Sequence, residues 1–154
     1  MADESNFPNS DVKGALRKKW TMSKSYQDFK RSKKITRERL TAKGVPSKIP
    51  SVSYKCDECG AESKESAPTG KKTKGGNPKR KFLIKVDHVY PVVDPKDGFQ
   101  DWATYWTRLY VPPEEWAERL QILCEYCHKS KTTQERDLRV LHGTLKRNGS
   151  NNPT

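Results

Sequence analysis

The stretch LQILCEYCHKSKT, residues 120–132, places two cysteines between an apolar run and a basic segment. Cys124 and Cys127 form one C-x-x-C pair, and Cys56 and Cys59 form the other. These are the 4 cysteines of the 154-residue chain. Two such pairs can close a tetrahedral zinc site with four thiolate ligands, which leaves no open position for water. The sequence therefore predicts a structural zinc ion, with a redox-active dithiol as the alternative.

Hydrophobic patterning predicts a mixed α+β fold around the zinc site. A basic helix is expected from Ser10, with an apolar stripe that reaches Trp20. Ser25, followed three residues later by Asp28, is typical of a capping box that opens a second basic helix with Phe29 facing inward.

The middle of the chain predicts short strands separated by loops. Glycine and proline mark residues 44–51 as an extended linker, and residues 52–54 predict a strand that leads into the first cysteine pair. Residues 62–80 are rich in Lys, Gly, Ser and Thr, which predicts a flexible basic loop. The bulky and β-branched residues 82–86 predict the next strand.

The C-terminal part predicts an inserted aromatic helix followed by a strand and a long helix. Residues 99–109 have aromatic side chains at helical spacing, and residues 112–120 predict a short helix that starts at two prolines. Residues 121–124 predict a brief strand, and residues 127–140 predict a helix that ends near Gly143.

The chain is strongly basic, and the charge is unevenly distributed. It carries 31 Lys and Arg against 19 Asp and Glu, a net charge of +12. Counted along the sequence, residues 1–50, 51–85, 86–126 and 127–154 carry +8, +5, −5 and +4, which sum to +12. This pattern favours a polyanionic partner held by the basic flanks, with a divalent cation at the acidic centre. A ribosome-associated or simply solvated basic protein is the alternative.

The sequence predicts neither membrane insertion nor secretion. No apolar run approaches the length that spans a membrane. The N-terminal segment MADESN lacks the basic and apolar regions of a signal peptide. A cytoplasmic location is expected.

Three histidines remain as candidates for chemistry. His88 follows Asp87 at the end of the predicted strand, so the carboxylate and the imidazole should point to opposite sides of the backbone. His128 directly follows the last cysteine and should lie in the first turn of the final helix. His142, beside Gly143, is expected to interact with the helix dipole and not to be catalytic.

The segment VDHVYP, residues 86–91, together with residues 120–132, resembles the signature of HNH endonucleases. The matching core spans residues 82–135, and the upstream cysteine pair extends the similarity to the zinc-bearing branch. Residues 98–110 are similar to small HNH endonucleases encoded by tailed bacteriophages, which would place the protein in the host-cell cytoplasm. The resemblance implies a ββα-metal core stapled by the four-cysteine zinc site.

The resemblance also implies roles for individual residues. His88 would act as general base, and Asp87 and His128 would hold one catalytic divalent ion such as Mg²⁺ or Mn²⁺. The expected products of DNA hydrolysis carry 5′-phosphate and 3′-hydroxyl ends. Lys129 and Lys131, near the start of the final helix, would add phosphate contacts.

Two positions depart from the family pattern. Arg119 stands where family members usually have Asn, whose amide ties the loop after the catalytic His; Arg119 is expected to replace that tie by bonding this loop or DNA. Thr132 stands where bacteriocin-type relatives have a further metal-binding His, which places this chain in the branch with two ligands.

These expectations divide the chain into a basic N-terminal arm at residues 1–50, a zinc-stapled nuclease domain at 51–142 and a disordered tail at 143–154. A non-catalytic, zinc-stapled nucleic-acid-binding protein is the alternative function. Double-strand cleavage would need two sites or a homodimer. The bases of the arm that we expect to contact DNA are Arg17, Lys18, Lys19, Lys30, Arg31, Lys33 and Lys34.

Overall fold

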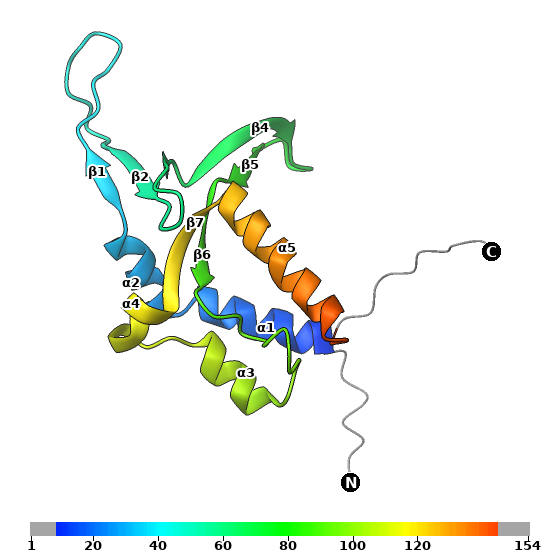
Figure 1. Cartoon of the computed structure of the whole chain (residues 1–154). Helices are drawn as coiled ribbons and strands as arrows, with labels where there is room; N and C mark the ends of the chain where they lie inside the picture. The colour runs from blue at the N-terminus through cyan, green and yellow to red at the C-terminus, as the bar shows by residue number, and fades with distance from the viewer. Residues whose placement is uncertain (1–8, 145–154) are drawn as a thin grey trace.

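A computed structural model describes residues 9–144, which form a mixed α+β fold, as predicted (Figure 1). The helices are α1 (Asn9–Thr21), α2 (Lys24–Ser32), α3 (Trp102–Leu109), α4 (Trp116–Arg119) and α5 (Glu125–Leu141), with a 3₁₀ turn at Pro113–Glu115. The strands are β1 (Ile35–Arg37), β2 (Ser51–Lys55), β3 (Glu62–Ser63), β4 (Ser66–Lys72), β5 (Pro78–Phe82), β6 (Ile84–His88) and β7 (Leu120–Cys124). The predicted disordered tail lies outside the described residues, apart from Gly143 and Thr144, which close the end of α5.

Two antiparallel strands followed by a helix form the centre of the molecule. In the pair of β6 and β7, Asp87 lies opposite Gln121 and His88 lies opposite Leu120. The helix α5 follows β7 without a loop, because the Cys124 side chain accepts a hydrogen bond from the backbone N–H of Cys127 and so caps the first turn. This arrangement brings the start of α5 close to β6.

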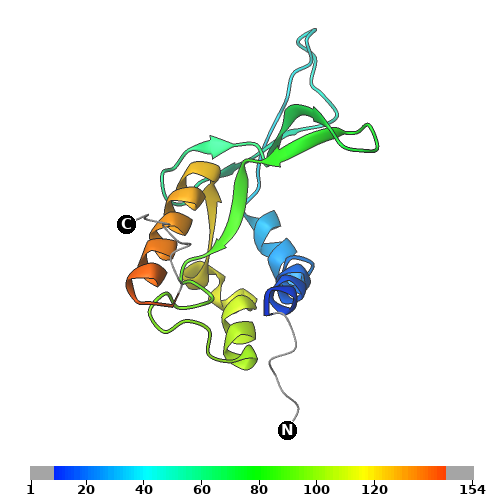
Figure 2. The same ribbon diagram turned by 90° about the vertical axis from the view of Figure 1, so that its right-hand side faces the viewer.

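The strand pair β6–β7 lies between two helical layers. Figure 2 shows α5 on one side of β6 and the N-terminal helices on the other. The hydrophobic core fills the space between the strands, α1, α2 and α3; its buried residues are Trp20, Phe29, Tyr54, Ile84, Tyr105, Leu109, Val111, Leu120 and Ile122. Consecutive residues of β6 therefore face different helices, since side chains alternate along a strand.

The N-terminal helices share this core with the rest of the chain. Trp20 on α1 and Phe29 on α2 are 3% and 2% exposed, respectively. A truncation that removed both helices would therefore expose the inner face of the strand pair. The predicted boundary at residue 50 falls in the loop before β2, outside the packed core.

The predicted capping role of Ser25 is wrong. Ser23 is the N-cap of α2, and its side chain accepts a hydrogen bond from the N–H of Tyr26. Ser25 lies inside the helix and is buried, where its hydroxyl donates to the carbonyl of Val111 and accepts from the indole N–H of Trp116. Two serines two positions apart both fit the start of a helix, and only the packing distinguishes them.

The predicted flexible loop at residues 62–80 is also wrong. These residues form β3 and most of a ribbon in which β4 and β5 pair antiparallel. The N–H of Thr73 donates to the carbonyl of Asn77, and the N–H of Gly76 donates to the carbonyl of Thr73. These bonds close the turn, where Gly76 adopts a φ of +80°. Backbone pairing and a few polar side-chain bonds hold this ribbon, so its side chains lack the alternating apolar pattern that would have predicted strands.

Smaller differences concern the flanking strands. The predicted strand at residues 82–86 begins two positions later, as β6, because Phe82 belongs to β5. The strand β1 was not predicted, and it pairs with β2 across the loop at residues 38–50. The aromatic helix and both C-terminal elements are confirmed, with α3 starting at Trp102 instead of Phe99. Within residues 9–144, no helix combines the length and the apolar character needed to cross a membrane.

Candidate functional site

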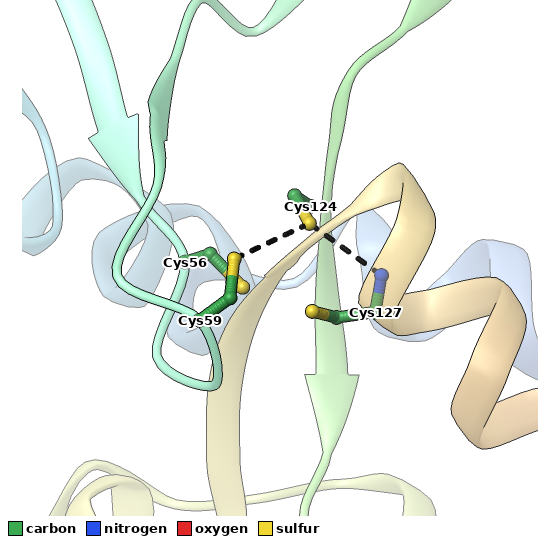
Figure 3. Close-up of side chains that lie close together, drawn as sticks. All are labelled: Cys56, Cys59, Cys124 and Cys127. Atoms are coloured by element: carbon green, nitrogen blue, oxygen red, sulfur yellow. Dashed lines mark hydrogen bonds between the residues drawn. The ribbon is translucent and has the colours of Figure 1, made fainter.

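The four cysteines meet at one point, as the sequence predicted (Figure 3). Their four sulfur atoms all lie within 4.8 Å of one another, and the Sγ atoms of Cys59 and Cys124 are 3.8 Å apart. A tetrahedral site with Zn–S bonds of about 2.3 Å has sulfur–sulfur edges of about 3.8 Å. The cluster therefore has the ligand set and the spacing to hold a metal ion such as zinc.

The two cysteine pairs are held together by the backbone as well. The N–H of Asp57 donates to the carbonyl of Ile122, and the N–H of Ile122 donates to the Asp57 carboxylate. These bonds attach the turn between β2 and β3 to the central strand β7. A metal ion here would join the β1–β2–β3 sheet to the start of α5, which are far apart in the sequence.

The environment of the cluster favours one thiolate before any metal binds. Burial raises the pKa of the Cys56 thiol, but backbone hydrogen bonds at Cys59, Cys124 and Glu58 outweigh it and lower this pKa to about 7. Burial and hydrogen bonds with the neighbouring thiols raise the pKa of Cys127 to about 12. Metal binding must therefore displace protons from this cluster, and acid opposes it.

Asp87 and His128 face each other between β6 and α5. The Nε2 atom of His128 lies 3.9 Å from Oδ1 of Asp87. An ion with bonds of about 2.1 Å to each atom can bridge up to about 4.2 Å, so one small divalent cation fits this pair. Burial, followed by the charge of Lys85, lowers the pKa of His128, which favours the neutral imidazole that a metal ion requires.

The second carboxylate oxygen of Asp87 already has protein partners. The Gln121 amide donates to Oδ2 over 3.0 Å, and the Lys131 ammonium pairs with the same atom and with the carbonyl of His88. Lys131 also lies 3.5 Å from Glu135 on the next turn of α5. The structure therefore places Lys131 at Asp87, while Lys129 is exposed and pairs with Glu125.

His88 points away from Asp87, toward α1 and α3, as the alternation along β6 predicted. Its Nε2 atom lies 2.7 Å from the carbonyl oxygen of Leu109, and its ring contacts Trp20 at 5.8 Å between centroids. A carbonyl oxygen only accepts hydrogen bonds, so Nε2 carries the proton. In the neutral ring, Nδ1 then has the lone pair and can accept a proton.

The surroundings of His88 favour this neutral form. Burial lowers its pKa, and the positive charges of Arg119 and Lys131 act in the same direction. The hydrogen bond to Leu109 and the charge of Asp87 oppose the shift without reversing it. The histidine opens onto a pocket of about 430 Å³, lined by His88, Tyr90, Pro91, Asp94, Thr107, Arg108 and Arg119.

Arg119 holds the end of the helix that orients His88. Its guanidinium donates to the carbonyls of Thr107 and Arg108, over 2.9 and 3.0 Å, and pairs with Glu115 over 2.6 Å. The next carbonyl along the chain, that of Leu109, accepts the bond from His88. Arg119 thus bonds the backbone beside the partner of His88, where we expected the loop after His88 or DNA.

The predicted DNA-contacting bases, which lie on α1, on α2 and directly after α2, fall into two groups. Arg17 donates to the Tyr105 hydroxyl, Lys30 pairs with Glu65, and Arg31 pairs with Asp28. Within residues 9–144, the exposed bases of the other group form no ion pair: Lys18, Lys19, Lys33 and Lys34.

Two residues of the site were not predicted from the sequence, Leu109 and Gln121. For Gln121, the strand register opposite Asp87 is the signal that reveals it. Leu109 contributes only its backbone carbonyl, and no side-chain pattern indicates that role.

Comparisons with known proteins do not add to this description. No protein-family model, curated protein or solved structure matches the chain. Any function assigned to the chain therefore rests on the geometry of the site.

Proposed function

We propose that this protein is a metal-dependent endonuclease that hydrolyses phosphodiester bonds in DNA, with zinc in the four-cysteine cluster as a structural ion. The observation that carries the proposal is the arrangement at the end of β6. There, Asp87 and His128 are close enough to share one divalent cation, and the adjacent His88 has a free Nδ1 lone pair. A protein that only binds nucleic acid has no need for two cation ligands beside a histidine that is oriented to accept a proton.

In the proposed reaction, the substrate phosphate lies across the end of β6. His88 Nδ1 takes a proton from a water molecule, the water oxygen attacks phosphorus, and the bond from phosphorus to the 3′ oxygen breaks. A divalent ion held by Asp87 and His128 would neutralise the phosphate and stabilise the leaving oxygen. Mg²⁺ and Mn²⁺ fit this carboxylate and imidazole pair. The leaving 3′ oxygen takes a proton from solvent water, so the products are 5′-phosphate and 3′-hydroxyl ends.

A non-catalytic nucleic-acid-binding protein is the second candidate, and one observation favours it. The ammonium group of Lys131 pairs with the Asp87 carboxylate, which already partly neutralises the acid that the divalent ion would use. If this pairing persists in the presence of the ion, the metal site does not form.

Relaxation of supercoiled plasmid, with and without Mg²⁺ or Mn²⁺, separates the two candidates. We expect nicked or linear products only when the divalent ion is present, with 5′-phosphate ends that ligase can rejoin. Binding of the plasmid without cleavage at any concentration of either ion would favour the second candidate.

The variants Asp87→Ala and His128→Ala should bind the catalytic ion more weakly, because each removes a proposed ligand. We expect the apparent affinity for Mn²⁺ to fall on the order of a hundredfold, with activity partly restored by excess ion. Calorimetric titration and plasmid relaxation over a range of Mn²⁺ concentrations measure both effects. The matched control is His142→Ala, which removes an exposed histidine at the end of α5; equal effects of the two histidine variants would contradict the assignment.

Arg119 should act as a positioning residue for His88. In Arg119→Ala, the end of α3 loses its two side-chain bonds, and a displacement of the imidazole by about 1 Å can cost on the order of a hundredfold in rate. We therefore expect turnover to fall by about ten- to a hundredfold, with DNA affinity nearly unchanged. Glu115→Ala removes the ion pair but keeps both carbonyl bonds, so this control should be nearly as active as the wild type.

Two outcomes would revise the role of Arg119. Full activity in Arg119→Ala would mean that α3 orients His88 without help. Loss of DNA affinity with unchanged turnover of bound substrate would mean that Arg119 contacts the phosphate backbone. The variant Arg119→Asn tests whether the shorter amide can serve at this position.

A further inference from the structure

The basic ribbon β4–β5, with its turn (residues 66–82), projects from the body of the protein (Figures 1 and 2). Every residue from Pro68 to Phe82 is exposed. A two-stranded ribbon with no buried face is only marginally stable by itself, and the core gains little from it. Its composition is therefore not explained by packing.

The ribbon carries six bases and no acid. They are Lys71, Lys72, Lys74, Lys79, Arg80 and Lys81. Arg80 donates to Ser66 on the opposite strand of the ribbon, and Lys81 pairs with Glu125 on α5. Within the part of the chain that the structure describes, the four lysines nearer the tip form no ion pair. Since side chains alternate along each strand, neighbouring basic side chains such as those of Lys71 and Lys72 project from opposite faces of the ribbon.

The end of the ribbon that is nearest the body lies beside the candidate metal site. A pocket of about 200 Å³ is lined by Lys81, Phe82, Lys85, Glu125, His128 and Lys129. Lys81 belongs to β5, whereas His128 is a proposed ligand of the catalytic ion on α5. A phosphate backbone that follows the ribbon toward the body therefore reaches His128 along a row of lysines.

We infer that the β4–β5 ribbon is a binding element for double-stranded DNA that enters the major groove and guides one strand to His128. The inference deepens the proposed endonuclease function and rests on it for the fate of the bound DNA. The major groove of B-form DNA admits a two-stranded ribbon and has a phosphate backbone on each side, which matches bases on both faces. The major groove of A-form RNA is too narrow for such an element.

The test compares two variants of equal charge. In the first, Lys71, Lys72, Lys74 and Lys79 are replaced by Gln; in the control, four exposed lysines elsewhere, Lys24, Lys43, Lys48 and Lys96, are replaced by Gln. Each set lowers the net charge by four, from +12 to +8. Binding to a duplex of about three helical turns is measured over a range of salt concentrations, without added divalent ion.

We expect the ribbon variant to bind the duplex on the order of tenfold more weakly at about 100 mM salt, with a smaller salt dependence. The slope of log affinity against log salt should decrease by up to about 3.6, since each lost phosphate contact contributes about 0.9. The control should change affinity by less than about threefold. Zinc content and thermal unfolding should be unchanged in both variants, because the ribbon supports no core.

Equal affinities and equal salt slopes for the two variants would overturn the inference. Equal competition by duplex RNA of the same length would also overturn it, since the ribbon would then recognise only the charge of the backbone. Because no divalent ion is present, the binding result is independent of cleavage. A protein that binds DNA through the ribbon but never cuts it would refute the nuclease proposal and leave this inference standing.

Discussion

His88→Ala should abolish DNA cleavage while leaving DNA binding and divalent-ion binding nearly unchanged. The imidazole is not among the proposed metal ligands, and its ring faces α1 and α3, on the other side of β6 from His128. General base catalysis contributes about 10²- to 10⁴-fold to the rate of an enzymatic hydrolysis. We expect the rate of single-turnover cleavage in saturating Mn²⁺ to decrease by a factor within this range.

Four measurements show whether the result is specific to the loss of the His88 imidazole. Calorimetric titration with Mn²⁺ should give the wild-type affinity, and binding to an uncleaved duplex should be unchanged. The control His142→Ala should cut at the wild-type rate. Thermal unfolding should be followed too, since the ring contacts Trp20. Loss of bound Mn²⁺ in His88→Ala would mean that His88 is a metal ligand. Cleavage by this variant at the wild-type rate would mean that His88 is not the general base.

Replacing Cys124 with serine should remove the structural metal and unfold the region around it. Cys56, Cys127 and Leu123 form a small buried cluster separate from the main core, with Cys124 packed against it. Few apolar side chains stabilise this region, so we expect metal binding to stabilise it. Structural zinc sites in zinc-finger peptides contribute about 10–16 kcal/mol of apparent binding free energy, most of which is also folding free energy.

We expect one zinc ion per wild-type chain by elemental analysis and none in Cys124→Ser, which should be insoluble or show a much lower melting temperature. The wild-type protein treated with a strong chelator should behave like the variant. Milder treatment that removes only the catalytic ion should leave the fold intact, because four thiolates bind zinc more tightly than one carboxylate and one imidazole. A soluble, zinc-free and active Cys124→Ser protein would be incompatible with a structural metal.

Some features of the fold could be predicted because they depend on local sequence. Aromatic residues at helical spacing predicted α3, and the terminal helix was predicted to end near Gly143, where the structure has a φ of +72°. The ribbon could not be predicted in this way. Its strands are held by backbone hydrogen bonds, which leave no pattern in the side chains.

The thiolate set of the candidate metal centre could be predicted from the sequence, because the spacing within each C-x-x-C pair and the chemistry of sulfur are local properties. The opposite orientation of Asp87 and His88 could be predicted as well, because adjacent residues of a strand point to opposite faces. Their partners depend on how distant elements pack against β6. His128 and Lys131 reach Asp87 because α5 folds back along β6, and Leu109 reaches His88 because α3 packs on the other face. Such contacts join residues 21 to 44 positions apart, and long-range packing, which no local pattern encodes, brings them together.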